Sequence, residues 1–224
     1  MFDKLILTVS VMAALIPATA FAEGETPSTL DQARAYLADR KPNEAIALVD
    51  PIIAKAEADE AKDPEAMCPG RAAEFFAALV QKDNLNVLVT IEDDWCEAML
   101  VKGFALSELK QKAEALAVLK KLVAHDNANP NYVSEYAFAL QTNGQLNDSF
   151  SNYQRVKTVA SSMRDKQAKK HWRAVALRGL GYIFIERKQW NEAIKFYKAS
   201  LKDEPDSKVA KSELEYIQQQ RPKN

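Results

Sequence analysis

Two histidines are the side chains best suited to acid–base or metal chemistry, and neither has the neighbours that such chemistry needs. His125 and His171 are the only histidines among 224 residues. They stand 46 positions apart, and no surrounding pattern matches a metal site or a catalytic triad. We expect His125 in a loop between helices and His171 in a charged segment, both solvated rather than catalytic.

Two adjacent carboxylate pairs, Asp93-Asp94 and Asp203-Glu204, also invite a catalytic interpretation. Both fall at predicted helix ends, where capping explains an acidic residue. The pair Gly179-x-Gly181 could suggest a dinucleotide loop, but it lies inside a helical pattern with no preceding strand, so we expect close helix packing there. The sequence thus predicts no catalytic residue, no cofactor and no metal. An enzyme with a hidden active site is the alternative.

The composition favours a helical chain with a substantial core. Hydrophobic residues make up 47% of the chain and charged residues 27%, with only 6 Gly and 9 Pro. The formal net charge of −1 lacks the basic excess of a nucleic-acid-binding protein. No apolar run reaches the roughly 18 residues of a transmembrane helix. We therefore expect neither nucleic-acid binding nor stable membrane insertion after signal cleavage.

The first 22 residues have the pattern of a secretory signal peptide. A Lys at position 4 precedes the 12-residue apolar segment LILTVSVMAALI, and Ala20-Phe21-Ala22 has the A-x-A form that predicts cleavage before Glu23. No cysteine stands at the cleavage point, so a lipoprotein anchor is not indicated. We expect a periplasmic or secreted chain, and an uncleaved anchor or a buried helix is the alternative.

Export changes the interpretation of the two cysteines. Cys68 and Cys96 form an even pair in an oxidising compartment, which favours a disulfide. Such a bridge would stabilise the fold by about 3–4 kcal/mol through the entropy of the unfolded chain. Two buried free thiols are the alternative, and the absence of a Cys-x-x-Cys motif argues against thiol exchange as a function.

Small, apolar and aromatic residues recur in a fixed order over residues 174–207. The ordered positions are Leu177, Leu180, Gly181, Phe184, Ala193, Tyr197 and Pro205. This pattern resembles the tetratricopeptide repeat, a 34-residue pair of helices. Leu177 stands where the family usually has Trp, and Ser200 where a second Ala is common.

The same spacing recurs upstream. Corresponding positions are Gly103, Leu106, Ala115 and Leu119 in residues 96–129, and Ala137, Leu140, Gly144, Ser149 and Tyr153 in residues 130–163. Ala33, Tyr36 and Ala45 place a weaker unit at residues 26–59. Lys102 and Gln32 stand where Leu is expected, so the first and second units are degraded.

The resemblance implies an all-α fold, a right-handed α-solenoid of stacked antiparallel helix pairs with a C-terminal capping helix. The expected organisation is a signal peptide (1–22), degenerate N-terminal repeats (26–95), three units within 96–206 (96–129, 130–163 and 174–206) with an insert (164–173), and a capping helix (207–220). Small residues should lie where helix axes approach most closely: Gly103, Ala115, Ala137, Ser149, Gly181 and Ala193.

Three segments need separate interpretation. Pro205 should end one helix and Asp206-Ser207 cap the next, whose inward face would hold Ala210, Leu214 and Ile217. The insert RDKQAKKHWR is basic, and we favour a solvated helix face over a site for an acidic partner or a lipid headgroup. Residues 60–95 suggest a decayed repeat, with a helix near 71–82 followed by the extended stretch NVLVTI.

In stacked repeats of this family, the first helix of each unit lines the concave face. One register on that helix holds Phe104, Phe138 and Tyr182, the residues after Gly103, Ala137 and Gly181. Such a ladder suits an extended or helical peptide, and the expected flanking residues are Leu100, Gln141, Arg178 and Ile185. The alternative is that the rings belong to the core. The family's carboxylate clamp has an Asn at this register, so binding of chaperone tails is not implied.

The sequence therefore predicts an exported bacterial protein of the tetratricopeptide repeat type, a non-enzymatic scaffold that binds another protein or peptide of the cell envelope. A structural subunit that assembles through its convex face or end helix is the runner-up. An enzyme or a polysaccharide binder is a third class.

Overall fold

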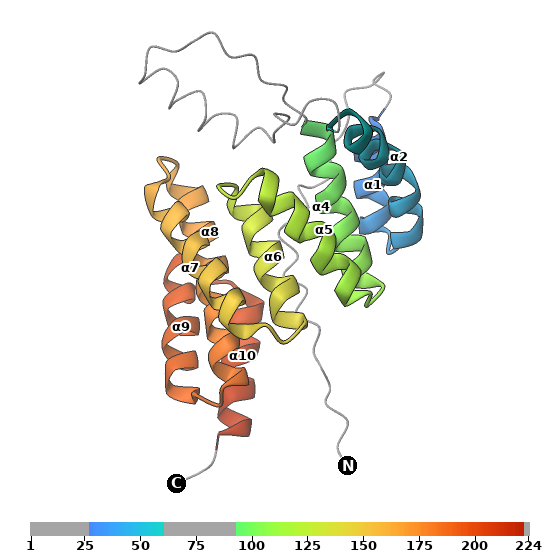
Figure 1. Ribbon diagram of the computed structural model, residues 1–224. Helices are drawn as coiled ribbons and strands as arrows, with labels where there is room; N and C mark the ends of the chain where they lie inside the picture. Colours follow the sequence, from blue (N-terminus) through green and yellow to red (C-terminus); the bar gives the residue numbers. More distant parts are fainter. Residues whose placement is uncertain (1–26, 61–92, 222–224) are drawn as a thin grey trace, which may run out of the picture.

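The computed structural model describes residues 27–60 and 93–221, and every regular element in these ranges is a helix (Figure 1). The elements are α1 (Thr29–Ala38), α2 (Pro42–Glu60), α4 (Asp93–Glu108), α5 (Lys112–His125), α6 (Pro130–Thr142), α7 (Leu146–Ser162), α8 (Lys166–Glu186), α9 (Trp190–Asp203) and α10 (Lys208–Gln220). The expected signal peptide, Cys68, the helix near 71–82 and the stretch NVLVTI lie outside the described residues.

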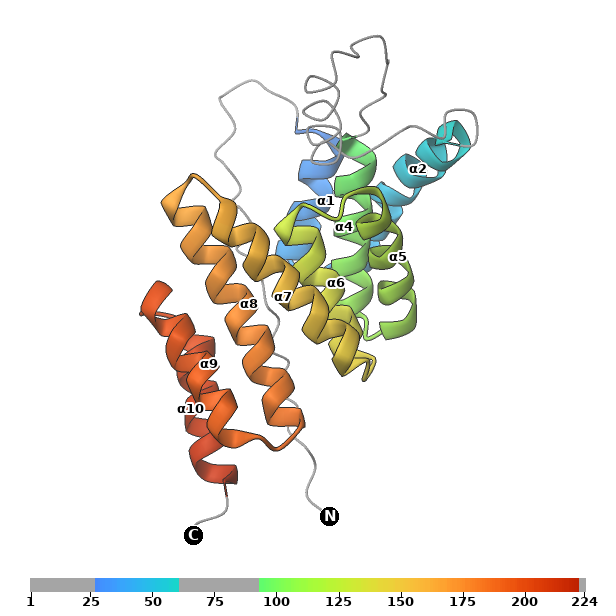
Figure 2. The same ribbon diagram turned by 60° about the vertical axis from the view of Figure 1, so that its left-hand side comes forward.

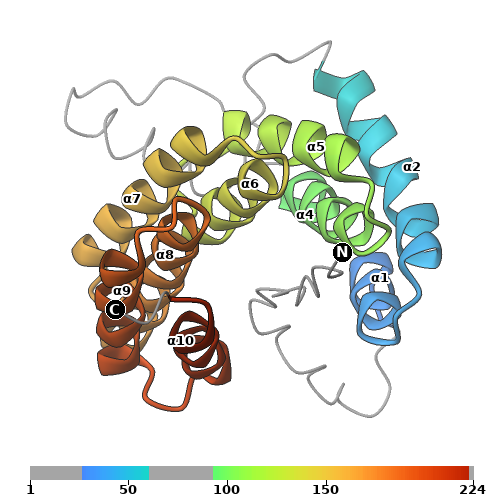
Figure 3. The same ribbon diagram turned by 90° about the horizontal axis from the view of Figure 1, so that it is seen from below.

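Consecutive helices pack against one another as antiparallel pairs that stack along the chain. Figure 2 shows α8 beside α7, and α10 beside α9 at the end of the stack. Seen from below, the stack follows an arc with α1, α4, α6, α8 and α10 on its inner side and α2, α5, α7 and α9 on its outer side (Figure 3). The predicted all-α solenoid is confirmed.

One turn geometry joins the two helices in each described pair. Arg40, Lys110, Gly144 and Lys188 all have positive φ, between 57° and 76°. In each turn the next residue donates its N–H to the carbonyl five positions back, at 2.8–2.9 Å. This is the Schellman arrangement, which closes a helix with a left-handed residue. The same turn joins α1 to α2. The unit whose sequence matches the repeat pattern least well, residues 26–59, therefore has the same turn between its helices as the other units.

Two glycines let the helices of a pair approach closely. A Cβ at Gly103 would lie 2.6 Å from the side chain of Leu119, and a Cβ at Gly181 would lie 2.8 Å from the ring of Tyr197. Each pair of residues is 16 positions apart and joins the first helix of a unit to the second. The expectation that these glycines mark close helix packing is confirmed.

In the unit of residues 130–163, Ala137 stands at the position of these glycines, and Ser149 stands at the position of the small residue on the second helix. Ala137 and Tyr153, again 16 positions apart, share one buried cluster. Ser149 is fully buried, and its hydroxyl donates to the Ala137 carbonyl at 2.8 Å, which joins α6 to α7. Gly179 faces the Tyr153 ring across the junction of α7 with α8, so Gly179-x-Gly181 serves packing, as expected.

Buried apolar residues of the described ranges form a larger core cluster over α1–α8, a small one over α6–α8 that contains Tyr153, and another at the C-terminal end. Trp95 and Met99 are among the largest fully buried side chains of the larger cluster. Ala210 and Ile217 bury the inward face of α10 against α9, and Leu214 packs beside them, as the sequence predicted. No helix in the described ranges is long and apolar enough to cross a membrane.

The helix caps agree with the sequence at α10 and add one at α8. Ser207 caps α10 by accepting the Ala210 N–H at 3.3 Å. Asp165 caps α8 by accepting the Ala168 N–H at 2.6 Å. Because α8 begins at Lys166, most of the basic insert forms its first two turns. Lys166 is exposed as expected, whereas the ring of Trp172 packs against the larger core cluster.

Candidate binding surface on the inner helices

The three predicted aromatic residues lie on successive inner helices, Phe104 on α4, Phe138 on α6 and Tyr182 on α8 (Figure 3). All three side chains are half-buried. Phe104 packs against the larger core cluster, so part of its ring serves the fold. The register thus combines packing area with area left open to solvent.

A fourth aromatic residue extends this register, and the sequence interpretation missed it. Tyr216 on α10 follows Tyr182 by 34 residues and is 44% exposed, the only large hydrophobic side chain exposed in the described ranges. The repeat period carries this signal, which the expectation of a capping helix at 207–220 does not include. We call Phe104, Phe138, Tyr182 and Tyr216 the inner aromatic register.

The four predicted flanking residues have different surroundings. Leu100 and Ile185 are 5% and 6% exposed and belong to core clusters, so their side chains serve packing. Gln141 is half-buried, and its Oε1 has no hydrogen-bond partner among the described residues. Arg178 forms an ion pair with Glu204.

Tyr182 lies among acidic and aromatic groups of two inner helices. Burial raises the pKa of Tyr182 to about 12, together with the charge of Glu186, hydrogen bonding to Glu186, and the proximity of Glu213 and Tyr216. Glu186 lies one turn further along α8, while Glu213 and Tyr216 lie on α10. The hydroxyl of Tyr182 is therefore within electrostatic range of side chains from both helices.

Two glutamates occupy equivalent places on the inner helices. Glu135 stands three residues before Phe138, and Glu213 stands three residues before Tyr216. Glu135 is 4% exposed, its Oε1 has no partner among the described residues, and burial raises its pKa to about 8. Burial also raises the pKa of Glu213. At neutral pH the Glu135 carboxyl is mainly protonated and can donate a hydrogen bond.

Charged side chains at the ends of α8 and α9 form a cluster that the sequence did not reveal. The Nδ1 of His171 lies 2.8 Å from Oε1 of Glu204, and the other oxygen of that carboxylate, Oε2, pairs with Arg178. Arg173 donates its Nε to Oδ2 of Asp203 at 2.6 Å and its Nη2 to Oδ1. Asp203 and Glu204 do lie at a helix end, and Glu204 is the C-cap residue of α9 through its backbone N–H. Their side chains form ion pairs instead of capping hydrogen bonds, and His171 and Arg173 are not simply solvated. These ion pairs tie the basic insert to α9.

The region around the start of α4 also differs from expectation. His125 is the last residue of α5, and its ring centroid lies 4.3 Å from that of the fully buried Trp95, so it is not a solvated loop residue. Cys96 is fully buried beside Trp95. Because Cys68 lies outside the described residues, the Cys68–Cys96 disulfide stays a prediction.

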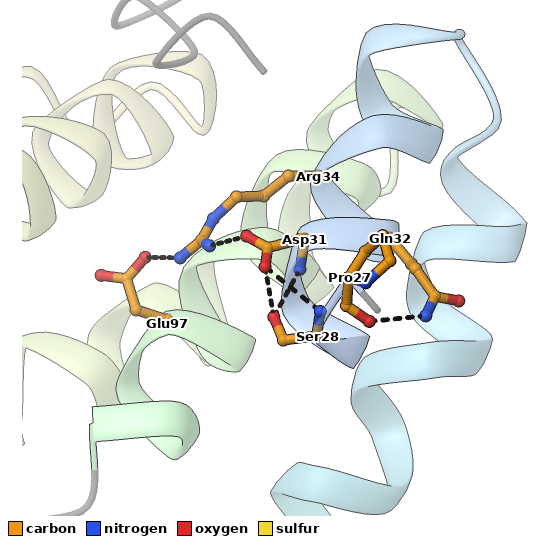
Figure 4. A network of polar contacts seen from close by, with 6 residues as sticks. All are labelled: Pro27, Ser28, Asp31, Gln32, Arg34 and Glu97. Carbon is orange, nitrogen blue, oxygen red and sulfur yellow. Dashed lines mark hydrogen bonds and ion pairs between the residues drawn. The ribbon is translucent and has the colours of Figure 1, made fainter. Parts of the chain in front are cut away.

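At the N-terminal end of the arc, the inner side carries a basic residue, Arg34, whose charge is balanced by carboxylates. Arg34 follows Ala33 as Phe104 follows Gly103, and it pairs with Asp31 at 3.2 Å and with Glu97 at 2.9 Å (Figure 4). The Ser28 hydroxyl and Asp31 form a capping box, and this hydrogen bond lowers the pKa of Asp31. The guanidinium of Arg34 thus joins α1 to α4 and has its charge balanced.

Neither the histidines nor the carboxylates assemble a metal site in the described ranges. No group of three or more His, Cys, Asp or Glu side chains there could hold a metal ion.

Comparisons with known proteins give a distant structural similarity. No family model matches the sequence, and no curated protein matches it. One similar solved structure is a chain of "Crystal structure of APC/C hetero-tetramer Cut9-Hcn1", with 14% identity, a TM-score of 0.48, and coverage of 85% of this chain and 36% of that chain. This chain thus spans about a third of the length of the matched chain. The fold assignment rests on the helix pairs, turns and glycine contacts, which are consistent with the tetratricopeptide repeat.

Proposed function

We infer that this chain is a non-enzymatic scaffold that binds another protein or peptide along the inner side of its arc. The observation that carries the inference is the inner aromatic register, repeated at one position on α4, α6, α8 and α10. Aromatic side chains bury a large area at low cost in conformational entropy, so they are common anchors in interfaces. The exposure of Tyr216 gives the register an accessible ring at the C-terminal end.

The N-terminal sequence supports a place for this activity in the cell envelope. Cleavage before Glu23 would deliver the chain to the periplasm or the exterior without stable membrane insertion. The proposed partner is another protein or peptide of the envelope, with no nucleic acid and no cofactor involved. Cleavage is tested by N-terminal sequencing of the exported chain, and an N-terminus at Met1 would contradict it.

Exchange of the open rings tests the binding role. Phe138→Ala and Tyr216→Ala are introduced together into the chain that begins at Glu23, and capture from an envelope extract is compared with the parent chain. Loss of a specific partner with unchanged far-UV circular dichroism supports the proposal. The matched control is Lys195→Ala, an exposed change on the outer helix α9. Equal capture by all three proteins would contradict binding through the inner side.

A structural subunit that assembles through its end helix is the second candidate, because Tyr216 is exposed on that helix. Removal of residues 207–224 would uncover Tyr197 and Ala193, which α10 packs against, so a point change is the sharper test. Size-exclusion chromatography of Tyr216→Ser separates the two candidates. A change in oligomeric state supports assembly through α10, and an unchanged state supports binding along the inner side.

A further inference from the structure

We propose that the corner between α7 and α8 binds the surface of an anionic lipid bilayer. The contact is made by four basic residues of the insert, which we call the basic corner: Arg164, Lys166, Lys169 and Lys170. This surface lies outside the inner aromatic register, so the inference adds a second interaction to the proposed function and does not depend on it.

The sequence around the basic corner is strongly depleted in acidic residues. Between Asp148 and Glu186, Asp165 is the only acidic residue, and its carboxylate caps α8 by accepting the Ala168 N–H at 2.6 Å. The whole chain has a formal net charge of −1. Positive charge is therefore concentrated at one end of the α7–α8 pair, in a chain that is close to neutral.

The basic corner is also unpaired in the fold. None of its four side chains forms an ion pair with a carboxylate in the described ranges. Arg164, Lys166 and Lys170 are exposed. Lys169 is half-buried, and its Nζ donates to the Ser161 carbonyl at 2.7 Å. The charge of the corner is therefore available to an external anionic surface.

The end of α9 supplies two carboxylates, and residues beyond the basic corner occupy both. Arg173 donates its Nε to Asp203 at 2.6 Å, and Nδ1 of His171 lies 2.8 Å from Glu204. The ring of Trp172 packs against the larger core cluster between these two contacts. The insert is thus divided into residues 171–173, which hold α8 in place, and the basic corner, which they carry.

The length of α8 takes the basic corner past the neighbouring inner helix. Helix α8 has 21 residues and α6 has 13, although both are followed by the same left-handed turn, at Lys188 and Gly144. The additional residues therefore lie at the N-terminal end of α8 and extend it by about 12 Å. Figure 2 shows this end at the upper left of the molecule, away from α4 and α6. A broad surface can approach it there.

The side chains of the corner favour a lipid surface over an acidic protein segment. Apart from Arg164 they are lysines, whose ammonium groups are compact charges without the fixed fork of a guanidinium. Such charges are attracted to mobile anionic headgroups without needing acceptors at set positions. Met163, half-buried at the tip between α7 and α8, adds an apolar side chain. The sequence alone favours a solvated face, whereas the unpaired charge on a projecting corner favours peripheral binding to a bilayer.

Vesicle flotation tests this inference on the chain beginning at Glu23. The vesicles contain phosphatidylcholine alone or phosphatidylcholine mixed with phosphatidylglycerol, and binding is measured at low and at physiological salt. The chain should float with the mixed vesicles only, and the bound fraction should fall as salt is added, because the attraction is electrostatic. Equal binding to both kinds of vesicle, or binding to neither, would overturn the proposal.

Charge-neutralising variants locate the contact. Lys166→Gln combined with Lys170→Gln should weaken binding to the mixed vesicles by about tenfold or more. The matched control is Lys195→Gln combined with Lys198→Gln, which removes the same charge from exposed positions on the outer helix α9 and should leave binding nearly unchanged. Equal loss in both variants would show that net charge alone attracts the chain, and the assignment to the basic corner would be wrong.

A fluorescent peptide of Glu and Ser residues tests the acidic-segment alternative by anisotropy. The bilayer proposal predicts weak binding of this peptide, with the same affinity in the parent chain and in the Lys166→Gln, Lys170→Gln variant. Tight peptide binding that requires Lys166 and Lys170, in a chain that does not float with the mixed vesicles, would assign the corner to an acidic protein segment and overturn the proposal.

Discussion

Gly181 packs against the ring of Tyr197 so closely that a Cβ on residue 181 would lie 2.8 Å from the ring. The contact joins α8 to α9 and fixes the distance between the inner and outer helix of the last complete pair. The same relation, at the same separation of 16 residues, joins Gly103 to Leu119 in an earlier pair. Packing of small against large residues therefore sets the geometry on which the inner aromatic register depends.

Gly181→Ala should destabilise the fold although alanine normally favours a helix over glycine. The added methyl group must displace Tyr197, which is 1% exposed and has little room to move. Overpacking of this kind costs about 1–3 kcal/mol. Urea unfolding followed by circular dichroism measures the change, and an unchanged or higher midpoint would show that the two helices separate without penalty.

Lys188→Gly should stabilise the chain, because Lys188 adopts φ 57° in the turn between α8 and α9. Relief of left-handed strain is worth about 1–2 kcal/mol, of which part is offset by the greater freedom of glycine in the unfolded chain. We expect a net gain of about 0.5–1 kcal/mol. The control is Lys195→Gly, at an exposed position within α9, which should lower the free energy of unfolding by about 1 kcal/mol. Destabilisation by both changes would contradict the turn geometry.

The close approach of the helices and the inward face of α10 could be predicted from sequence because both follow from local periodicity. Gly103, Gly181 and Ile217 stand at positions that one helix pair dictates, whatever the neighbouring pair does. The burial of Leu100 and Ile185 could not be predicted in this way, because an adjacent helix covers these side chains in the stack.

The polar contacts could not be predicted from the sequence pattern either. His171 and Glu204 are separated by 33 residues, and Arg173 and Asp203 by 30, so their pairing depends on how the long α8 lies against the end of α9. Tyr216 could have been found, since it follows Tyr182 by one full period. The repeat period therefore extends into the capping helix, where it predicts the position of the exposed ring.

The stability of the fold should decrease as the pH rises, because burial raises the pKa of Glu135 from 4.5 to about 8. The folded chain holds this proton more tightly than the unfolded chain, so the stabilisation is fully present below about pH 4.5 and is lost as the pH rises through about 8. The loss is on the order of 4 to 5 kcal/mol. Burial of Glu213 acts in the same direction.

Glu135→Gln isolates this contribution from the other titrating groups. Urea unfolding of the parent chain and the variant at pH 5 and pH 9 should give a much smaller decrease for the variant, since the amide does not ionise. A variant as sensitive to pH as the parent would show that Glu135 is hydrated or paired in the folded chain.

In-cell photocrosslinking tests the central claim most directly, that a partner binds along the inner side of the arc. A photoreactive phenylalanine analogue replaces Phe138 or Tyr216 on the inner helices, or Lys195 on the outer helix α9, and mass spectrometry identifies the adducts. The account predicts one shared protein or peptide partner at positions 138 and 216 that is absent at 195. A partner captured at 195 alone would contradict it.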